Sequence, residues 1–444
     1  ADLAARHGEM QRDLDVVIFG ATGDTGVAGC CFLYFRGRRL GISRWAPAAR
    51  NLHKLKTDVL DKLSQAPGLD GVAFSEPIQA DAEDHDSLLR MCKRTKCVVA
   101  CAGPFARYGE GVVKACIEAG TNYVDITGEL PWVEKMEQRY GEEALQKGVT
   151  LVSMAGYDSV PPDLTTFLAA KGLKDAGESL ARFDVFCGGD GVMPTGTIET
   201  VCDMVDGAKS AFLHAVSCSL LGQRRQKPVR AQGAGERMLP RSSKPYVPKE
   251  ATRFTSNLIF TMIPGYSRLG RTFCLPHFMA PVNVGVVHRT AYHEGYPGLV
   301  YRERLGPPFK GLIPMLVGIV AGICVAVFFS LPYATSLLRR FVASINQGLM
   351  KKVRARMFAG YSPTGKTMAD GVGISESGTM MAKVGMSCEY DPGLSFTMLS
   401  ACVVAGSIVK KLQANDRALG GFQTAVTAVG GEVLADALRA AGVA

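Results

Sequence analysis

The stretch Gly20-Ala-Thr-Gly-Asp-Thr-Gly26 decides the fold, because of the sequence on either side of it. Before it, Asp15-Val-Val-Ile-Phe19 is a short apolar run, which is typical of a strand buried in a parallel sheet. After it, residues 26–35 are apolar and long enough for about three helical turns. A glycine-rich turn between a first strand and a first helix is the arrangement that a dinucleotide-binding fingerprint requires. The alternative is an ordinary glycine-rich turn, which does not require this position.

In a dinucleotide-binding turn the glycines permit a tight bend, let backbone amides approach the pyrophosphate, and let the helix pack on the sheet. The helix N-terminus adds N–H groups and a positive dipole for the phosphates. Two threonines in the turn can add hydroxyl donors. We therefore predict a cofactor site made by Gly20, Thr22, Gly23, Thr25 and Gly26.

Strand and helix signals alternate through the first third of the chain. Strand signals recur at residues 38–44, 78–81, 97–101, 123–126 and 149–153. Helical signals lie at residues 84–92, 109–120 and 130–147. This alternation predicts an α/β fold whose first domain, residues 13–160, is a Rossmann domain with a doubly wound parallel sheet.

The alternation is lost after about residue 181, where residues 182–187 and 282–292 have a β-like pattern. We expect a second α/β domain with a mixed sheet over residues 161–390. Within it, residues 223–250 are rich in Arg, Gln, Pro and Ser, which is the composition of a mobile basic loop. We expect residues 391–412 to form a helix that returns to the first domain, and residues 413–444 to form a C-terminal tail.

The end of the second strand decides which dinucleotide binds. An NAD site usually places an acidic residue there, to accept a hydrogen bond from the ribose 2′-hydroxyl. The predicted strand ends in Leu40-Gly-Ile-Ser-Arg44, without an acid, and Arg38, Arg39 and Arg50 lie nearby in the sequence. Ser43 and Arg44 are therefore predicted to bind a 2′-phosphate, which favours NADP(H) over NAD(H). The alternative for Arg44 is a solvated surface charge.

Two more strand ends are predicted to face the cofactor, because ligands of doubly wound sheets bind at the carboxyl ends of the strands. The fourth strand runs into Ala102-Gly103-Pro104, a turn on which the nicotinamide half can lie. Asp81, at the end of the third strand, contacts the adenine or caps the next helix.

The sequence does not identify a catalytic residue. Hydride transfer belongs to the cofactor, so the protein must supply orientation and a proton donor. Tyr108 and Asp158 are weak candidates, and Asp125, Glu129 and Tyr157 also lie near strand ends. For each of them a capping or packing role is the alternative.

Composition and charge limit the class of protein. Charged residues make up 20% and hydrophobic residues 47%, which excludes a disordered chain and a disulfide miniprotein. The net charge of +9 is concentrated locally: residues 224–249 hold eight Lys or Arg against one Glu, and residues 339–356 hold six without an acid. Without a nucleic-acid motif, these clusters favour anionic lipid or phosphate.

The 13 cysteines are scattered, so we expect thiols in a reducing compartment and no metal site.

Residues 311–338 carry no charge over 28 residues, and Pro314 and Pro332 bracket a cleaner run, Met315–Leu331, of 17 residues. At 1.5 Å per residue this run is about 25 Å long, at the short limit for a bilayer span. Basic flanks favour a helix that inserts into a membrane or lies in its surface. A buried core helix is one alternative, and contact with a hydrophobic protein or a second copy is another.

Several motifs resemble those of the saccharopine dehydrogenase-like oxidoreductases. They are the glycine turn, residues 101–129, Gly156-Tyr-Asp-Ser-Val-Pro-Pro-Asp-Leu164, Tyr361-Ser-Pro-Thr-Gly-Lys366 and Asp391-Pro-Gly393. The resemblance implies a Rossmann domain, a second α/β domain, a returning C-terminal helix, and association with lipid droplets or other membranes. It also implies a link to lipid or glycolipid metabolism, since mycobacterial relatives include trans-acting enoyl reductases.

Two departures from the family pattern concern the cofactor. Asp24 replaces the usual aromatic residue and brings a negative charge close to the phosphates, and the predicted second-strand end lacks the Ala-Gly-Arg form. Saccharopine itself is a poor candidate substrate, because a doubly charged amino acid does not match an apolar segment. We predict an NADP(H)-dependent oxidoreductase of a lipid-type substrate. The alternative is a catalytically silent cofactor-binding scaffold or accessory subunit of a membrane complex.

We expect a membrane-associated location, on lipid droplets or an organelle membrane. The sequence begins at Ala1, which fits a chain that has lost an organellar leader.

Overall fold

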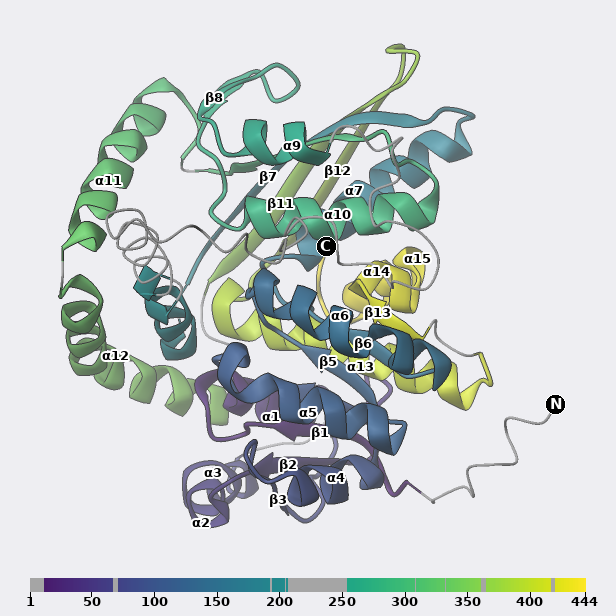
Figure 1. Cartoon of the computed structure of the whole chain (residues 1–444), viewed down its shortest axis with the longest axis vertical. Coiled ribbons are helices and arrows are strands. Elements are labelled where there is room, and N and C mark those ends of the chain that lie inside the picture. The colour runs from purple at the N-terminus through teal and green to yellow at the C-terminus, as the bar shows by residue number, and fades with distance from the viewer. Residues whose placement is uncertain are drawn as a thin grey trace, which may run out of the picture.

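A computed structural model describes residues 12–444 except 67–70, 192–193, 204, 207–253, 308, 332, 361–364 and 417–419. The predicted basic loop, residues 223–250, lies outside the described residues. Two sheets dominate the molecule, and a long pair of helices runs down one flank (Figure 1). The α/β class and the Rossmann-type sheet predicted from the sequence are confirmed.

The first sheet has seven strands in the order β13-β6-β5-β4-β1-β2-β3, and all of its pairings are parallel. The strands are β1 Leu14–Phe19, β2 Trp45–Ala49, β3 Ile78–Gln79, β4 Thr95–Ala100, β5 Asn122–Asp125, β6 Thr150–Val152 and β13 Gly421–Gln423. The helices between them are α1 Asp24–Arg36, the short α2 Leu52–Leu55, η1 Lys56–Leu60 and α3 Asp61–Ser64, then α4 His85–Arg94, α5 Phe105–Ala119 and α6 Leu130–Gln146.

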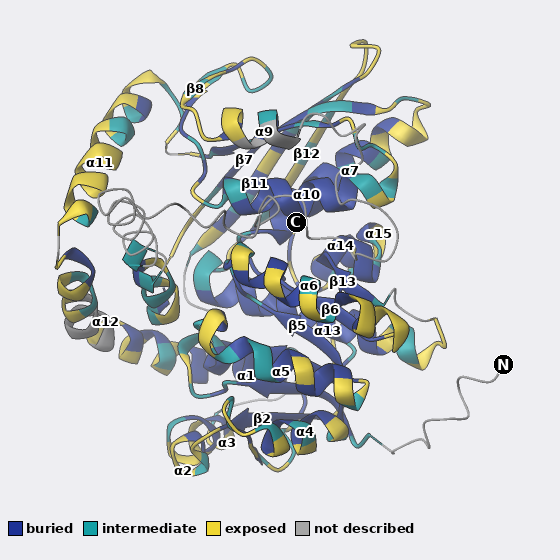
Figure 2. Ribbon diagram, in the orientation of Figure 1, coloured by how far each residue is buried: buried dark blue, intermediate teal, exposed yellow. Residues whose placement is uncertain are grey.

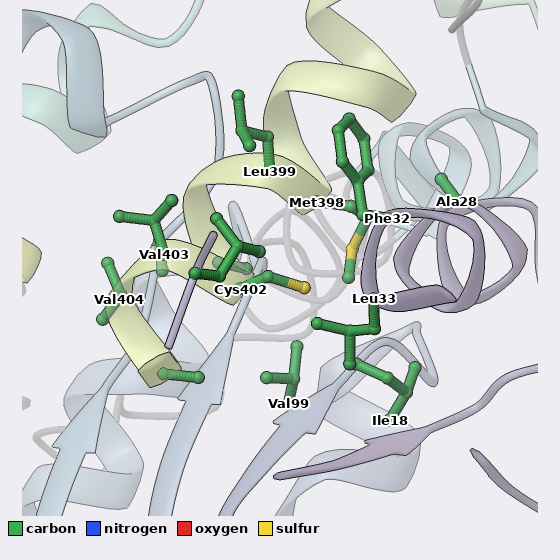
Figure 3. Packing of buried hydrophobic residues seen from close by; sticks show 14 of the residues in the cluster. Ile18, Ala28, Phe32, Leu33, Val99, Met398, Leu399, Cys402, Val403 and Val404 are labelled. Carbon is green, nitrogen blue, oxygen red and sulfur yellow. The ribbon is translucent and has the colours of Figure 1, made fainter. Parts of the chain in front are cut away.

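Both faces of this sheet are covered, which explains why β1 is apolar from Val16 to Phe19. Val16 and Ile18 face α1 and the later helix α13 (Thr397–Gln413), which follows η2 (Pro392–Phe396). Val17 and Phe19 face the other way, toward α4, α5 and α6. Figure 3 shows the first face, where Met398 and Cys402 of α13 lie against α1 and β1.

The predicted second strand was wrong, because residues 38–41 form a turn, residues 42–44 have no regular structure, and β2 begins at Trp45. The sequence Trp45-Ala-Pro-Ala-Ala49 looks unlike a strand, since proline lacks the N–H that a central strand donates. Nevertheless all five residues are buried, and β2 pairs with β1 and β3.

The second sheet has the order β10-β7-β11-β12 and is mixed, with β7 parallel to β10 and antiparallel to β11. Its strands are β7 Leu180–Asp190, β10 Val300–Leu305, β11 Lys366–Ser375 and β12 Met381–Cys388. Helices α7 (Val160–Asp175), α9 (Phe254–Thr261) and α10 (Ala280–Glu294) and the hairpin of β8 (Gly265–Ser267) and β9 (Thr272–Cys274) complete the domain. The β-like pattern at 282–292 therefore belongs to a buried helix, α10, and not to a strand.

The residues predicted to form a C-terminal tail are part of the core instead. Strand β13 extends the first sheet beside β6, and α14 (Ala425–Val429) and α15 (Gly431–Ala440) follow it. The last residue, Ala444, exchanges two backbone hydrogen bonds with Ser387 of β12. The C-terminal segment thus joins the two sheets.

The apolar segment forms α11 (Leu312–Ser330), and α12 (Ala334–Phe358) follows it. Figure 2 shows α11 as a mostly exposed ribbon on the flank of the molecule. Within the described residues, two helices are apolar and long enough to cross a membrane, but 89% of the window in Pro392–Gln413 is buried in the protein and only 6% of that in α11. The alternative of a buried core helix does not apply to α11.

Candidate functional site

The glycine turn forms a cradle that only glycine fits at two positions. Gly20 has a φ of +86°, and a Cβ there would lie 2.8 Å from the backbone nitrogen of Ala102. A Cβ on Gly26 would lie 2.2 Å from the carbonyl oxygen of Gly20. The turn is closed by a 3.0 Å hydrogen bond from Gly23 N–H to the same oxygen. With glycine at these positions no side chain covers the turn, so its backbone amides are open to the close approach that a pyrophosphate requires.

Helix α1 presents its N-terminus to this cradle. Gly23 is the N-cap residue, and no side chain of the described residues caps α1 there. The first N–H groups are therefore available to an anion, which is the usual phosphate site of such folds. Thr22 and Thr25 are partly exposed beside them, as their predicted role requires.

Asp24, whose charge argued against phosphate binding, is paired. Its Oδ1 lies 2.6 Å from Nη2 of Arg354 in α12, and its Oδ2 accepts a 3.0 Å hydrogen bond from the Thr195 hydroxyl. Arg354 also donates to the carbonyl oxygen of Thr22, at 3.3 Å. The guanidinium neutralises the carboxylate beside the cradle, so the residues present fit an anionic dinucleotide.

Ser43 and Arg44 lie at the wrong edge of the sheet for the role predicted for them. They precede β2, at the amino edge, where Asp15 Oδ2 accepts hydrogen bonds from the Ser43 hydroxyl at 2.7 Å and the Arg44 N–H at 3.0 Å. Lys96 pairs with the same carboxylate at 2.7 Å. The mistaken strand boundary caused this error, because the residues predicted to end the second strand lie directly before its first residue, Trp45.

Arg50 occupies the position that the prediction sought. It follows β2 directly, in Ala48-Ala49-Arg50, and its side chain is exposed. The Ala48 carbonyl accepts hydrogen bonds from Gly20 N–H (3.0 Å) and Ala21 N–H (3.1 Å), so this strand end adjoins the cradle. The signal was present in the sequence as a small-small-Arg strand end, six residues later than expected.

The other predicted cofactor residues gather at the same edge. Ala102 follows β4 and touches Gly20, and Gly103 and Pro104 lead into α5. Asp81 follows β3 and accepts a hydrogen bond from Glu83 N–H at 3.2 Å, while Asp84 caps α4. Asp81 is therefore not the cap of that helix, and its carboxylate stays at the carboxyl edge of the sheet.

Most catalytic candidates have structural roles. Glu129 accepts hydrogen bonds from Phe105 N–H (2.8 Å) and Ala106 N–H (2.7 Å) and so caps α5. Asp125 is fully buried, and burial raises its pKa to about 6 although Thr127 N–H and the Ser153 hydroxyl donate to it. Tyr108 lies partly buried in the first turn of α5.

Asp158 lies beside a buried polar cluster that the sequence did not reveal. His277 Nδ1 is 2.6 Å from Glu303 Oε1, and both side chains are almost fully buried. Asn283 Nδ2 donates to Glu303 at 2.9 Å and to the Asp158 carbonyl at 2.5 Å. Burial raises the pKa of Asp158 to about 6, and the nearby His277 opposes that shift. These residues come from three distant segments, so no local motif marks them.

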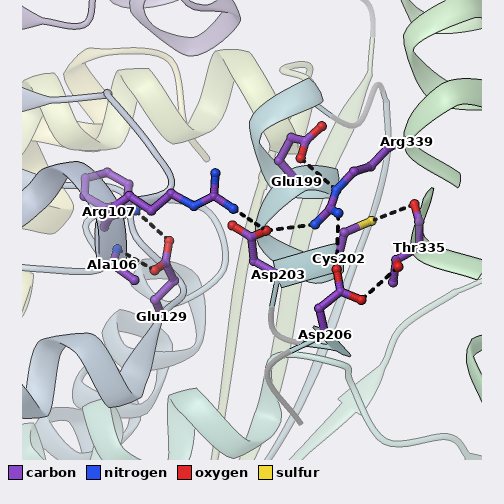
Figure 4. Close-up of polar contacts among 10 residues, drawn as sticks. Ala106, Arg107, Glu129, Glu199, Cys202, Asp203, Asp206, Thr335 and Arg339 are labelled. Carbon is purple, nitrogen blue, oxygen red and sulfur yellow. Dashed lines mark hydrogen bonds and ion pairs between the residues drawn. The ribbon is translucent and has the colours of Figure 1, made fainter. Parts of the chain in front are cut away.

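A second network holds α12 over the cofactor edge. In the helical residues 195–203, Asp203 binds both Arg107 of α5 and Arg339 of α12, each at 2.8 Å. Arg339 also reaches Glu199 and Asp206, as Figure 4 shows. The start and the end of α12 are thus both fixed by ion pairs near the site.

The geometry defines a Rossmann-type dinucleotide-binding protein, and comparisons with known proteins identify the type. Residues 16–152 match the family model of the saccharopine dehydrogenase NADP binding domain. Residues 16–152 are thus similar to this NADP-binding domain, and both the resemblance recognised in the sequence and the preference for NADP(H) are confirmed.

Three relatives illustrate the range of similarity. A Caenorhabditis elegans protein named lipid droplet localized protein is 36% identical over 212 residues, 47% of this chain and 49% of that protein. A mouse saccharopine dehydrogenase-like oxidoreductase is 40% identical over 161 residues, 35% of this chain and 37% of that protein. These two alignments cover less than half of either relative. A Mycobacterium tuberculosis protein, provisionally named a trans-acting enoyl reductase, is 26% identical over 97% of both chains.

Among solved structures, the apo saccharopine dehydrogenase (L-Glu forming) of Saccharomyces cerevisiae aligns over 96% of this chain and 97% of its own. The TM-score is 0.48 and the sequence identity 12%.

Proposed function

We propose that the protein is an NADP(H)-dependent oxidoreductase that acts on a lipid-type substrate while bound to a lipid surface. The observation that carries the proposal is the exposure of α11, an uncharged helix attached to a protein with an NADP-binding cradle. The names of the worm and mycobacterial relatives support the same direction, since they refer to lipid droplets and to enoyl reduction.

The apolar surface of α11 is larger than water normally tolerates. Ile313, Val317, Val320 and Ile323 are 59–74% exposed. Strand β9, which carries the exposed Phe273, contacts α11, and the second domain has further exposed apolar side chains at Ile259, Phe260, Met262, Ile263, Tyr266 and Phe278. Soluble monomers rarely expose contiguous apolar patches above a few hundred Å², so this surface requires an apolar partner.

Charge favours an anionic lipid surface as that partner. In α12, Arg340, Lys351, Lys352 and Arg356 are exposed. Each basic side chain near an anionic membrane contributes about 1 kcal/mol.

The packing of α11 favours insertion along its side over a full span. The helix has 19 residues and is about 28 Å long, close to the hydrocarbon thickness of about 30 Å. However, Met315 is buried, and a Cβ on Gly318 would lie 2.1 Å from a methyl of Leu275. One stripe of the helix is therefore held by protein, and the other stripes are free to enter lipid.

Cosedimentation with anionic vesicles of phosphatidylcholine and phosphatidylserine tests the proposal. We expect wild-type protein to bind and the Val317→Glu/Val320→Glu variant to stay in solution with unchanged NADPH affinity. Val433→Glu is the control, since Val433 is 52% exposed on α15. Self-association of wild type without vesicle binding would identify a second copy as the partner and contradict the lipid surface.

The position of Cys324 gives an independent measurement. Cys324 is exposed in the middle of α11, whereas the other described cysteines are buried. Cys218 lies outside the described residues and is replaced by Ser for this measurement. In that background, vesicles should protect Cys324 from a water-soluble maleimide. Labelling that is equally fast with and without vesicles would exclude insertion of α11.

A measurement of turnover distinguishes an enzyme from a catalytically silent scaffold. Bound NADPH fluorescence should decay when long-chain enoyl or keto lipids are supplied in vesicles. Stable fluorescence across such a panel would favour a silent cofactor-binding scaffold.

A further inference from the structure

We propose that His277, oriented by Glu303, is the proton donor of the reaction and acts from above the carboxyl ends of β5 and β6. This inference rests on the proposed oxidoreductase function and deepens it.

Glu303 fixes the orientation and the tautomer of His277. Its two oxygens accept three hydrogen bonds, from His277 Nδ1 at 2.6 Å, Asn283 Nδ2 at 2.9 Å and the Tyr301 hydroxyl at 2.7 Å. An ionised carboxylate only accepts, so Nδ1 carries a hydrogen and Nε2 is the nitrogen that can exchange a proton. Among the described residues, none makes a hydrogen bond to Nε2.

The cluster is tied to the carboxyl edge of the Rossmann sheet. Asn283 donates to the Asp158 carbonyl and accepts a 2.7 Å hydrogen bond from the Ser159 hydroxyl, in the loop after β6. On the other side, a Cβ on Gly128 in the loop after β5 would lie 3.0 Å from the Met279 methyl. Substrates of doubly wound enzymes meet the cofactor at this edge.

The same segment connects His277 to the lipid-facing helix. Leu275 packs on Gly318 of α11, and the Phe273 carbonyl accepts a 2.8 Å hydrogen bond from Gly311 N–H. Phe278, next to His277 in the chain, is 65% exposed, and its ring lies 4.6 Å from the His277 ring between centroids in a tilted arrangement. An acyl chain that leaves the lipid beside α11 would therefore meet apolar side chains on its way to His277.

The chemistry balances with one proton. NADPH held at the glycine cradle would supply the hydride for the carbonyl or enoyl carbon of the substrate. His277 gives its Nε2 proton to the carbonyl oxygen, or to the α-carbon of an enoyl substrate, and remains neutral with Nδ1–H on Glu303. Solvent restores the proton, so one substrate, one NADPH and one proton give the reduced lipid and NADP⁺.

Substitution with a matched control tests this role. We expect His277→Gln to lower kcat by about 100- to 10,000-fold, the usual contribution of a general acid, with unchanged NADPH affinity. The control is His288→Gln, because His288 is also buried in this region but bonds to Asn257. Equal losses in both variants, or full activity in His277→Gln, would overturn the proposal.

The pH profile distinguishes a proton donor from a structural residue. A limb of the wild-type pH profile that depends on His277 should be absent in His277→Gln. Titratable groups around the cluster are Glu303, Tyr301, Asp158, Tyr157 and Cys187. A limb that persists in His277→Gln would contradict the assignment.

A measurement without substrate keeps this proposal separate from the lipid assignment. In protein with ¹⁵N-labelled histidine, the spectrum of neutral His277 should show the Nδ1–H tautomer that remains after proton donation, and the Nε2 resonance should shift on saturation with NADP⁺. An Nε2–H tautomer, or no response to NADP⁺, would place His277 away from the reaction. If wild type binds NADPH but reduces no lipid, the lipid substrate is wrong, and the spectrum alone decides the role of His277.

Discussion

At the scale of single residues, Arg50 is the basic side chain that stands at the end of β2 beside the cradle. We expect Arg50→Ala to weaken NADPH binding by about 10- to 100-fold, since a charge-assisted contact is worth about 1.5–3 kcal/mol. NADH binding should change little, because NADH lacks the 2′-phosphate. Fluorescence titration measures both affinities. Arg44→Ala is the control at the opposite edge, and a larger effect there would reverse the assignment.

Asp24 and Arg354 should be coupled in cofactor binding. The pair is mostly buried, with 11% and 26% of the side chains exposed. Arg354→Ala would leave a carboxylate unpaired beside the phosphates and should weaken NADPH binding, whereas Asp24→Asn/Arg354→Ala should recover affinity. A coupling energy of about 0.5–3 kcal/mol is normal for such contacts. Calorimetric titration of the four proteins gives this value, and additive effects would show that the two residues act independently.

Local and distant signals explain which site residues could be predicted. Gly20 and Gly26 are recognisable because strand, turn and helix are adjacent in the sequence. Arg354, His277 and Glu303 are not, because each reaches the site only through the packing of a separate element. Arg44 was predicted in place of Arg50 because the β-like Ile42 suggested a strand that ends at Arg44. The true strand, which Arg50 follows, contains Pro47 and did not look like a strand.

At the scale of elements, periodicity predicted buried strands better than buried helices. The first-domain elements β1, β4, α5 and α6 were recognised because each lies between polar or glycine boundaries. Helix α10 was taken for a strand because Val282, Val284, Val286 and Val287 are β-branched. Because α10 is buried on almost every side, between α7, α9 and β10, it lacks the polar face by which a helix is recognised in a sequence.

The contact between α7 and α10 should make stability depend on pH. Asp163 of α7 is buried, accepts a 2.9 Å hydrogen bond from the Thr290 hydroxyl of α10, and has its pKa raised by burial from 3.8 to about 8. The folded state therefore keeps a proton that the unfolded state loses. The contribution of this group to the free energy of unfolding is complete below about pH 4. It falls by about 1.4 kcal/mol per pH unit as the pH rises from about 4 to about 8.

Asp163→Asn should remove this dependence, as urea unfolding between pH 5 and pH 8 would show. Asp175→Asn is a control on the same helix, since the Asp175 side chain is 62% exposed. An unchanged pH slope in Asp163→Asn would mean that the group is ionised in the folded protein.

At the scale of the whole molecule, the C-terminal segment joins the two sheets. Truncation after residue 412 would remove β13, α14 and α15 and with them the buried side chains Val426, Val429, Leu434 and Leu438. Burial of each such side chain contributes about 1.5–3 kcal/mol, and a domain is stable by only about 5–15 kcal/mol. We expect the truncated chain to lose its cooperative thermal transition, which calorimetry would detect. A truncated protein that still melts cooperatively and binds NADPH would show that the segment is dispensable.

The position of α11 on one flank has a kinetic consequence. Under the proposed function, a protein held there by lipid would search for its substrate by lateral diffusion in two dimensions. Its velocity would then follow the mole fraction of substrate in the surface, and dilution of the surface with inert phospholipid would lower the rate at constant bulk concentration. The amount of lipid surface in the cell would set the working substrate level of the enzyme.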